Sequence, residues 1–145
     1  MKPIAKKINN EIYPLDENIV SSKVEYIMTS DEIGWNILRR GLTFIFIVAC
    51  KKLDAQSEVK LMHSLNKGIY CKVKSETVLT VENIKNEMIK LIEKDLTFKN
   101  IRMPKNEVLE LLKTENNKKD KYYLFAHKDV DIVELNELDG VYDFF

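Results

Sequence analysis

Histidine and cysteine offer the most versatile chemistry in this chain, and it has two of each. The stretch VKLMHSLNKGIYCKV, residues 59–73, contains His63 and Cys71. A zinc site needs about four N, S or O ligands at fixed spacings, and Cys50 and His127 have no paired neighbours that could complete one. A nucleophilic Cys71 would need an adjacent base, whereas its neighbours indicate a strand with alternating faces. We therefore expect no metal site and no catalytic residue in this chain.

A phosphate-binding loop of the form G-x-x-x-x-G-K-[ST] is the second chemical possibility, and the glycine spacing excludes it. The chain has four glycines, and the residues five positions beyond them are Arg39, Phe46, Val73 and Phe145. No second glycine stands where such a loop requires one. We expect no nucleotide site of this type and no cofactor in the chain itself.

Composition narrows the class of protein. The 145 residues are 45% hydrophobic and 32% charged, which is typical of a globular domain. Lys and Arg number 23, as do Asp and Glu, so the net charge is zero and nucleic-acid binding is not favoured. The apolar run Leu42–Cys50 is too short to span a bilayer, and basic pairs flank it. Two cysteines without paired spacing favour the reducing cytoplasm. We expect a cytoplasmic protein without a membrane segment.

The elements that would position these residues follow from periodicity and end signals. Short strands are predicted at 4–8, 11–13 and 24–28. Thr29 and Glu32 have the spacing of a capping box, so a long helix should begin there and become apolar on both sides in its second half. The remaining expected elements are a hairpin over 59–73 with its turn at 66–68, a helix capped by Thr80, an extended segment at 97–103, a short helix with Pro104 in its first turn, a helical turn at 122–127, and strands at 131–135 and 141–145.

The expected fold is α+β, with a long central helix packed on an antiparallel sheet and flanked by shorter helices. If the N-terminal half of the central helix runs beside the hairpin, Arg40 and His63 line one cleft. His63 stands where the first hairpin strand meets the turn, and it either binds a ligand there or only caps the turn. Arg40, His63 and Tyr70 are the candidate pocket, because a guanidinium beside an imidazole and an aromatic wall suits a small anion such as a carboxylate or phosphate.

Several segments, taken in order, resemble a known pair of modules. Residues 8–15 and the strand near Val24 are similar to the last part of a TGS domain, the ubiquitin-like module at the start of threonyl-tRNA synthetases. ILRRGLTFIFIVACKKL and VENIKNEMIKLIEKDLTFKNIRMPKNEVLELL resemble the editing-type domain that follows it. The resemblance implies a truncated, β-rich TGS-like piece at 1–28 and an editing-like domain at 29–145, the latter cut short at its C-terminus.

The same modules also open a group of bacterial uridine-kinase-like nucleoside kinases. That group has a double Arg before the central helix and a later segment H-S-L-x-x-G-x-Y-C, which residues 63–71 fit. By this resemblance the chain is the N-terminal accessory region, regulatory or ligand-binding, of a uridine kinase. Its partner would be a P-loop kinase domain in cis, beyond Phe145, which would use ATP and Mg²⁺ to phosphorylate a nucleoside.

Two alternatives remain, a hydrolytic editing fragment of a threonyl-tRNA synthetase and a stand-alone RNA-binding or interaction module. The editing family carries His-x-x-x-His on the central helix, and those positions fall on Arg40 and Phe44 here. The family's later Cys would fall at or beside Phe145, and its partner His would lie past the last residue. Arg keeps its proton and cannot replace a neutral imidazole, and Phe has no polar group. The residues therefore predict a non-hydrolytic domain.

Overall fold

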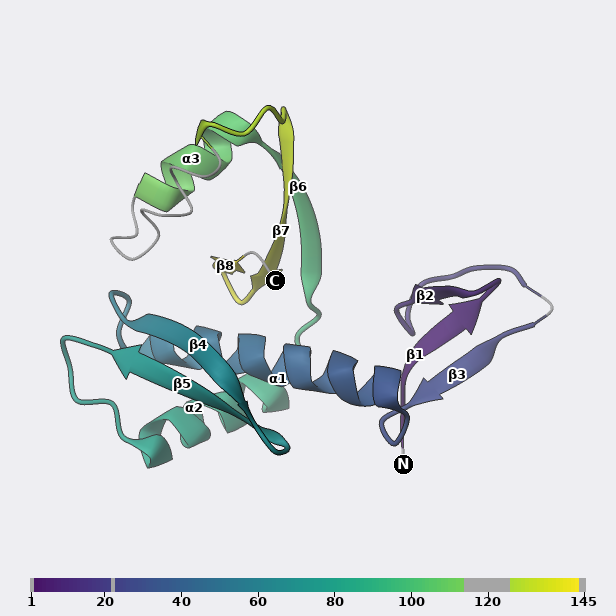
Figure 1. The fold of residues 1–145 in the computed structure, drawn as a ribbon, viewed down its shortest axis with the longest axis horizontal. Helices are drawn as coiled ribbons and strands as arrows, with labels where there is room; N and C mark the ends of the chain where they lie inside the picture. Colours follow the sequence, from purple (N-terminus) through teal and green to yellow (C-terminus); the bar gives the residue numbers. More distant parts are fainter. Residues whose placement is uncertain (1, 22, 114–125, 144–145) are drawn as a thin grey trace. The chain divides into compact units, whose positions relative to one another are not determined.

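The computed structural model describes residues 2–21, 23–113 and 126–143, and it has the expected α+β class. Its antiparallel strands form three small sheets (Figure 1). The chain divides into two compact units, residues 1–44 and 45–145, and helix α1 (Glu32–Leu53) runs from the first into the second. The predicted domain boundary at residue 28 stays a prediction. The helical turn expected at 122–127 falls mostly outside the described residues.

The first unit begins with a three-stranded sheet in the order β2-β1-β3. Strands β1 (Pro3–Ile8), β2 (Glu11–Tyr13) and β3 (Glu25–Met28) confirm the three predicted strands. Asn9 and Asn10 form the tight turn between β1 and β2, with φ of 52° and 65°, a backbone region that asparagine tolerates better than most residues. Ala5, Ile8 and Ile27 are the buried side chains of this sheet.

The start of α1 differs from the predicted capping box. The helix begins at Glu32, and it is the Asp31 carboxylate that accepts a hydrogen bond from the Met28 N–H at 2.8 Å. The Trp35 N–H donates to the Asp31 carbonyl, which makes Asp31 the residue that closes the first turn. Gly34 lets β3 approach this turn closely, because a Cβ there would lie 1.9 Å from the Met28 carbonyl oxygen.

The second half of α1 is buried nearly all round, as predicted for a central helix. Phe44, Ile47, Val48, Ala49 and Cys50 are at most 8% exposed. The helix is longer than the apolar run alone suggested, and among the described residues it is the one helix whose length and composition would allow a membrane crossing. A third of its most apolar window is buried, and two adjacent arginines lie within the helix, where lipid would disfavour them.

The second unit continues with the predicted hairpin and capped helix. Strands β4 (Glu58–Leu65) and β5 (Gly68–Lys74) pair antiparallel around Asn66 and Lys67. Helix α2 (Val81–Glu93) begins at Thr80, whose hydroxyl accepts from the Asn83 N–H at 3.1 Å, which confirms the predicted cap. The apolar face of α2 buries Ile84 and Leu91.

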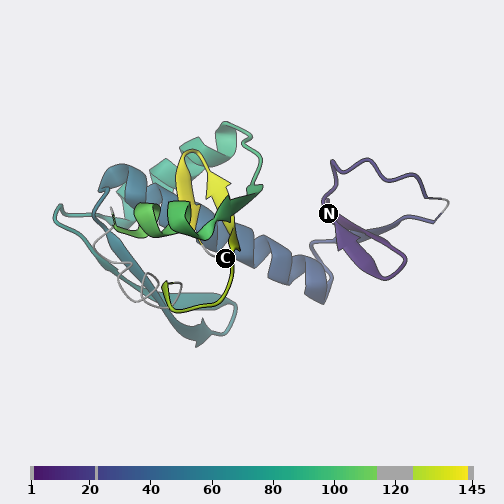
Figure 2. The ribbon, with the colours of Figure 1, turned by 90° about the horizontal axis from the view of Figure 1, so that it is seen from above.

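A three-stranded sheet with one helix against it ends the described chain. Strands β6 (Lys99–Pro104), β7 (Ile132–Leu138) and β8 (Val141–Asp143) pair in that order, and α3 (Lys105–Lys113) lies against β6 and β7 (Figures 1 and 2). Val108 and Leu112 of α3 pack with Val133 and Leu135 of β7. Pro104 is the last residue of edge strand β6 and not the first of the helix, a position that tolerates its missing N–H.

Two carboxylates connect the elements of this unit. Asp139, in the β7–β8 turn, lies 3.1 Å from the Lys52 Nζ at the end of α1 and 3.2 Å from the Lys94 Nζ at the end of α2. Asp54, just after α1, accepts hydrogen bonds from the backbone N–H groups of Gln56, Glu76 and Thr77. It therefore joins the loop before β4 to the loop after β5.

The lysine partners keep the pKa of Asp139 below its ordinary value of 3.8. Its contribution to stability is therefore complete above about pH 4 and is lost as the pH falls through the lowered pKa. Asparagine at this position keeps the left-handed turn backbone (φ 49°) but removes the charge.

We expect Asp139→Asn to lower the melting temperature at pH 7 and to make it less sensitive to acid between pH 5 and about pH 2. Thermal unfolding of both proteins across that range measures this. Parallel curves with the same acid dependence would show that Asp139 does not connect the three elements.

Candidate functional site: the β4–β5 hairpin

The pairing of β4 with β5 contains one irregularity that determines where its side chains lie. Lys60 pairs with Lys72 and Leu61 with Cys71, but the next pair is His63 with Tyr70. Met62 has no partner and forms a β-bulge. In a regular ladder Met62 would take the place opposite Tyr70, and every later residue of β4 would change face. The bulge therefore puts His63 on the same face as Lys60.

The hairpin has two chemically different faces as a result. One face carries the pairs Val59 with Val73, Leu61 with Cys71, and Ser64 with Ile69. The other carries Glu58 with Lys74, Lys60 with Lys72, His63 with Tyr70 and, next to the turn, Leu65 with Gly68. We call this second set the polar face. On β5 the apolar positions are partly buried, while Tyr70, Lys72 and Lys74 are exposed.

His63 and Tyr70, two residues of the predicted pocket, are brought together on the polar face. Their ring centroids lie 5.3 Å apart with an interplanar angle of 46°. This distance is within the range of aromatic contacts, so the two rings form one exposed aromatic surface near the hairpin turn.

Arg40, the third residue of the predicted pocket, belongs to the other compact unit. It is exposed on α1, one turn before Phe44, which is only 2% exposed. Whether Arg40 shares a cleft with His63 and Tyr70 stays a prediction. Phe44 is a core residue, so neither of the two positions onto which the resemblance places the editing histidines carries a group that could bind a metal or accept a proton.

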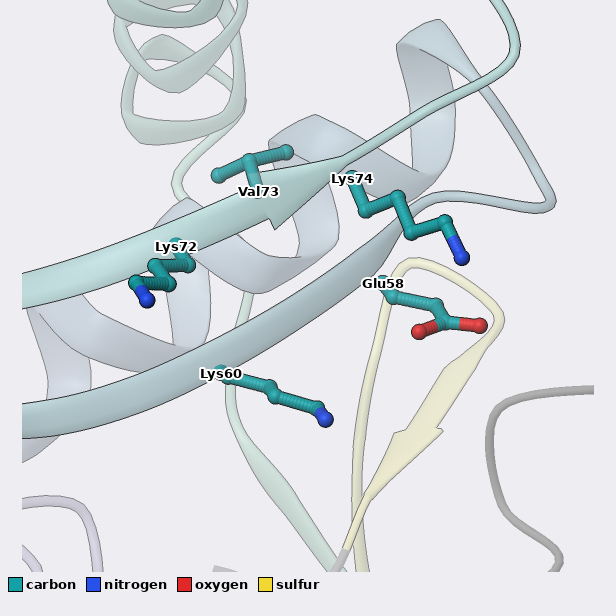
Figure 3. A pocket seen from close by; sticks show the side chains of 5 residues that line it. All are labelled: Glu58, Lys60, Lys72, Val73 and Lys74. Atoms are coloured by element: carbon teal, nitrogen blue, oxygen red, sulfur yellow. The ribbon is translucent and has the colours of Figure 1, made fainter.

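A shallow cavity of about 450 Å³ lies at the open end of the hairpin and is lined by Glu58, Lys60, Lys72, Val73 and Lys74. Lys60, Lys74 and Glu58 extend to the same side of the strands, and Val73 points away from it (Figure 3). Sequence reasoning did not single out these lysines. Lysines at positions 72 and 74 alternate along a strand, and this pattern could have predicted a basic face. The bulge that brings His63 onto the same face leaves no such pattern in the sequence.

Neither cysteine is placed to act as a nucleophile with His63. Cys50 is fully buried, and burial raises the pKa of its thiol to about 11, which disfavours the thiolate. Cys71 lies on the hairpin face opposite His63. Within the described ranges, no group of three or more His, Cys, Asp or Glu side chains could hold a metal ion.

Comparison with known proteins shows what the chain resembles. No protein-family model matches it. It is 28% identical to a threonine–tRNA ligase of Desulforamulus reducens over 120 residues, which are 78% of this chain and 18% of that protein. It is also 28% identical to a threonine–tRNA ligase of Lactobacillus helveticus over 145 residues, 97% of this chain and 22% of that protein.

A threonine–tRNA ligase of Clostridioides difficile is 27% identical over 116 residues, 77% of this chain and 18% of that enzyme. The chain thus spans about a fifth of the length of the curated relatives it matches. These matches support the resemblance to the TGS and editing-like modules of threonyl-tRNA synthetases, the other name of these ligases. The Lactobacillus match covers both compact units. None of these relatives is a nucleoside kinase.

Deleting Met62 tests the bulge. The shortened strand can form a regular ladder in which Lys60, Leu61 and His63 keep their present partners. We expect the free energy of unfolding to change by less than about 1 kcal/mol, as measured by urea denaturation.

Deletion of Ser64 is the matched control. A regular ladder without Ser64 would place His63 opposite Ile69, so we expect a loss of about 0.5–1.5 kcal/mol, because the ring contact between His63 and Tyr70 is lost. A larger loss for the Met62 deletion than for the Ser64 deletion would contradict the assigned register.

Proposed function

We propose that the chain is a non-hydrolytic accessory module, related to the N-terminal TGS and editing-like region of threonine–tRNA ligases, that binds a small anionic ligand. The relationship is supported by the match to threonine–tRNA ligases over as much as 97% of the chain. The absence of hydrolysis is supported by one observation above all, the burial of Phe44 in the core, since the resemblance places an editing histidine at this residue.

The physical reason is the same at both positions. A metal ligand or general base needs an unprotonated nitrogen or oxygen with access to the substrate. Arg40 is accessible but stays protonated, and Phe44 is inaccessible and has no polar atom. The hydrolytic alternative is therefore favoured by the similarity to threonine–tRNA ligases, but Arg40 and Phe44 do not supply the groups that hydrolysis needs.

The ligand-binding part of the proposal concerns residues of the β4–β5 hairpin. His63 and Tyr70 form an exposed aromatic surface beside a basic cavity, which suits an anion. We also propose a cytoplasmic location, in keeping with two cysteines that are both free thiols.

A uridine-kinase-like parent is a second candidate. It is favoured by the H-S-L-x-x-G-x-Y-C form of residues 63–71, which the structure folds into a hairpin with the His and Tyr in ring contact. In that case a P-loop domain in cis would bind ATP and Mg²⁺ and carry out the phosphorylation. The comparisons give this candidate no support.

The purified chain should not deacylate mischarged tRNA above the spontaneous rate, and it should contain well under one equivalent of zinc by elemental analysis. A threonine–tRNA ligase with its editing histidines intact serves as the positive control in the same assay. Measurable deacylation by this chain, or one equivalent of bound zinc, would overturn the non-hydrolytic assignment.

The reading frame downstream of Phe145 separates the two candidate parents. A kinase parent predicts a G-x-x-x-x-G-K-[ST] loop in the same frame. Sequencing the gene beyond this segment tests that, and a continuation into further ligase-like sequence without such a loop would exclude the kinase.

A further inference from the structure

The polar face of the hairpin carries an excess of positive charge, with three lysines against the single carboxylate of Glu58, which is opposite Lys74. Lys60 and Lys72 are directly opposite each other, an arrangement that is destabilising for like charges in antiparallel strands. Lys74 follows on the same face. Within the described residues, none of the three lysines is within ion-pair distance of a carboxylate, and Glu58 is the one acidic side chain of the cavity they line.

Like charges held together without partners are a cost that an anionic ligand would remove. The three ammonium groups supply up to nine N–H donors, and phosphate oxygens are the acceptors that pair best with several such donors at once. A single carboxylate would leave part of this charge uncompensated. The cavity of about 450 Å³ is the size of a small-molecule site.

The aromatic pair adds a second recognition element at a defined distance. Two neighbouring residues on the same face of a strand are about 7 Å apart along it. Tyr70 therefore lies about 7 Å along β5 from Lys72 and about 14 Å from Lys74. The Met62 bulge keeps the His63 ring on this side. A ligand that reaches from the lysines to the rings would therefore need phosphates at one end and a flat ring at the other.

We propose that the polar face binds a nucleoside di- or triphosphate, with its phosphates on Lys60, Lys72 and Lys74 and its base against Tyr70 and His63. This inference deepens the proposed accessory function by naming the class of its ligand, and it does not involve the positions of the editing histidines. Base stacking on an aromatic ring and phosphate pairing with lysine are the two interactions used, and neither needs a P-loop.

A small nucleotide is favoured over an RNA strand by charge. The chain has no net positive charge, and the basic surface on the hairpin is short and interrupted by Glu58. An RNA strand would need a longer basic track to follow its phosphates.

Calorimetric titration of the full chain tests this with three probes: a nucleoside triphosphate, inorganic tripolyphosphate, and a single-stranded oligoribonucleotide. We expect the triphosphate to bind more tightly than tripolyphosphate. Lys60→Gln/Lys72→Gln should weaken both by roughly tenfold or more, because charge-assisted hydrogen bonds are lost. Tyr70→Leu should weaken the nucleotide but leave tripolyphosphate binding unchanged.

Lys67→Gln in the hairpin turn is the matched control, since it removes one exposed lysine outside the cavity and should bind as the wild type does. The double lysine variant should melt no lower than the wild type, because it removes a like-charge pair, and so weaker binding cannot come from unfolding. Three results would overturn the proposal: no detectable binding of the nucleotide, equal binding by all variants, or tighter binding of the oligoribonucleotide. Deacylation of tRNA would refute the non-hydrolytic function and leave this nucleotide test unaffected.

Discussion

The first strand of the hairpin, β4, has eight residues, and the second, β5, has seven. The position of the one extra residue determines which side chains share each face of the hairpin. Side chains in a strand alternate between faces, so one unpaired residue reverses the face of everything that follows. The extra residue is Met62. Before it the even-numbered residues of β4 lie on the polar face, and after it the odd-numbered residues do. His63 joins the lysines for this reason.

Two carboxylates join the elements around this hairpin in the second unit. Asp54 binds backbone N–H groups on both sides of the hairpin, and these hydrogen bonds lower the pKa of its carboxyl group. Asp139 joins the ends of α1 and α2 through Lys52 and Lys94. The lysines of the polar face differ from Lys52 and Lys94, because no carboxylate among the described residues pairs with them. Three lysines on one face of the hairpin, without an ion pair among the described residues, form a surface suited to an anionic ligand.

Local rules of sequence predicted most elements. Thr80 as a cap, the turn at Asn66, and the strands of all three sheets were predictable because each depends on neighbours in the chain. The failures have equally local causes: at the start of α1, Asp31 closes the first turn in preference to Thr29, and Pro104 ends β6 because an edge strand tolerates it. Of the predicted pocket, His63 and Tyr70 meet, while the position of Arg40 beside them is untested. The lysine cavity was not predicted, because a bulge leaves no regular pattern in sequence.

Nuclear Overhauser effects in the wild-type chain show directly whether Met62 forms the bulge. The bulged register predicts contacts between the ring protons of His63 and Tyr70, together with contacts between Ser64 and Ile69 on the opposite face. A regular ladder would instead give contacts between His63 and the methyl groups of Ile69, and between Met62 and Tyr70. The first pattern supports one polar face that extends from the lysines to the aromatic rings. The second would put His63 on the apolar face and contradict the account.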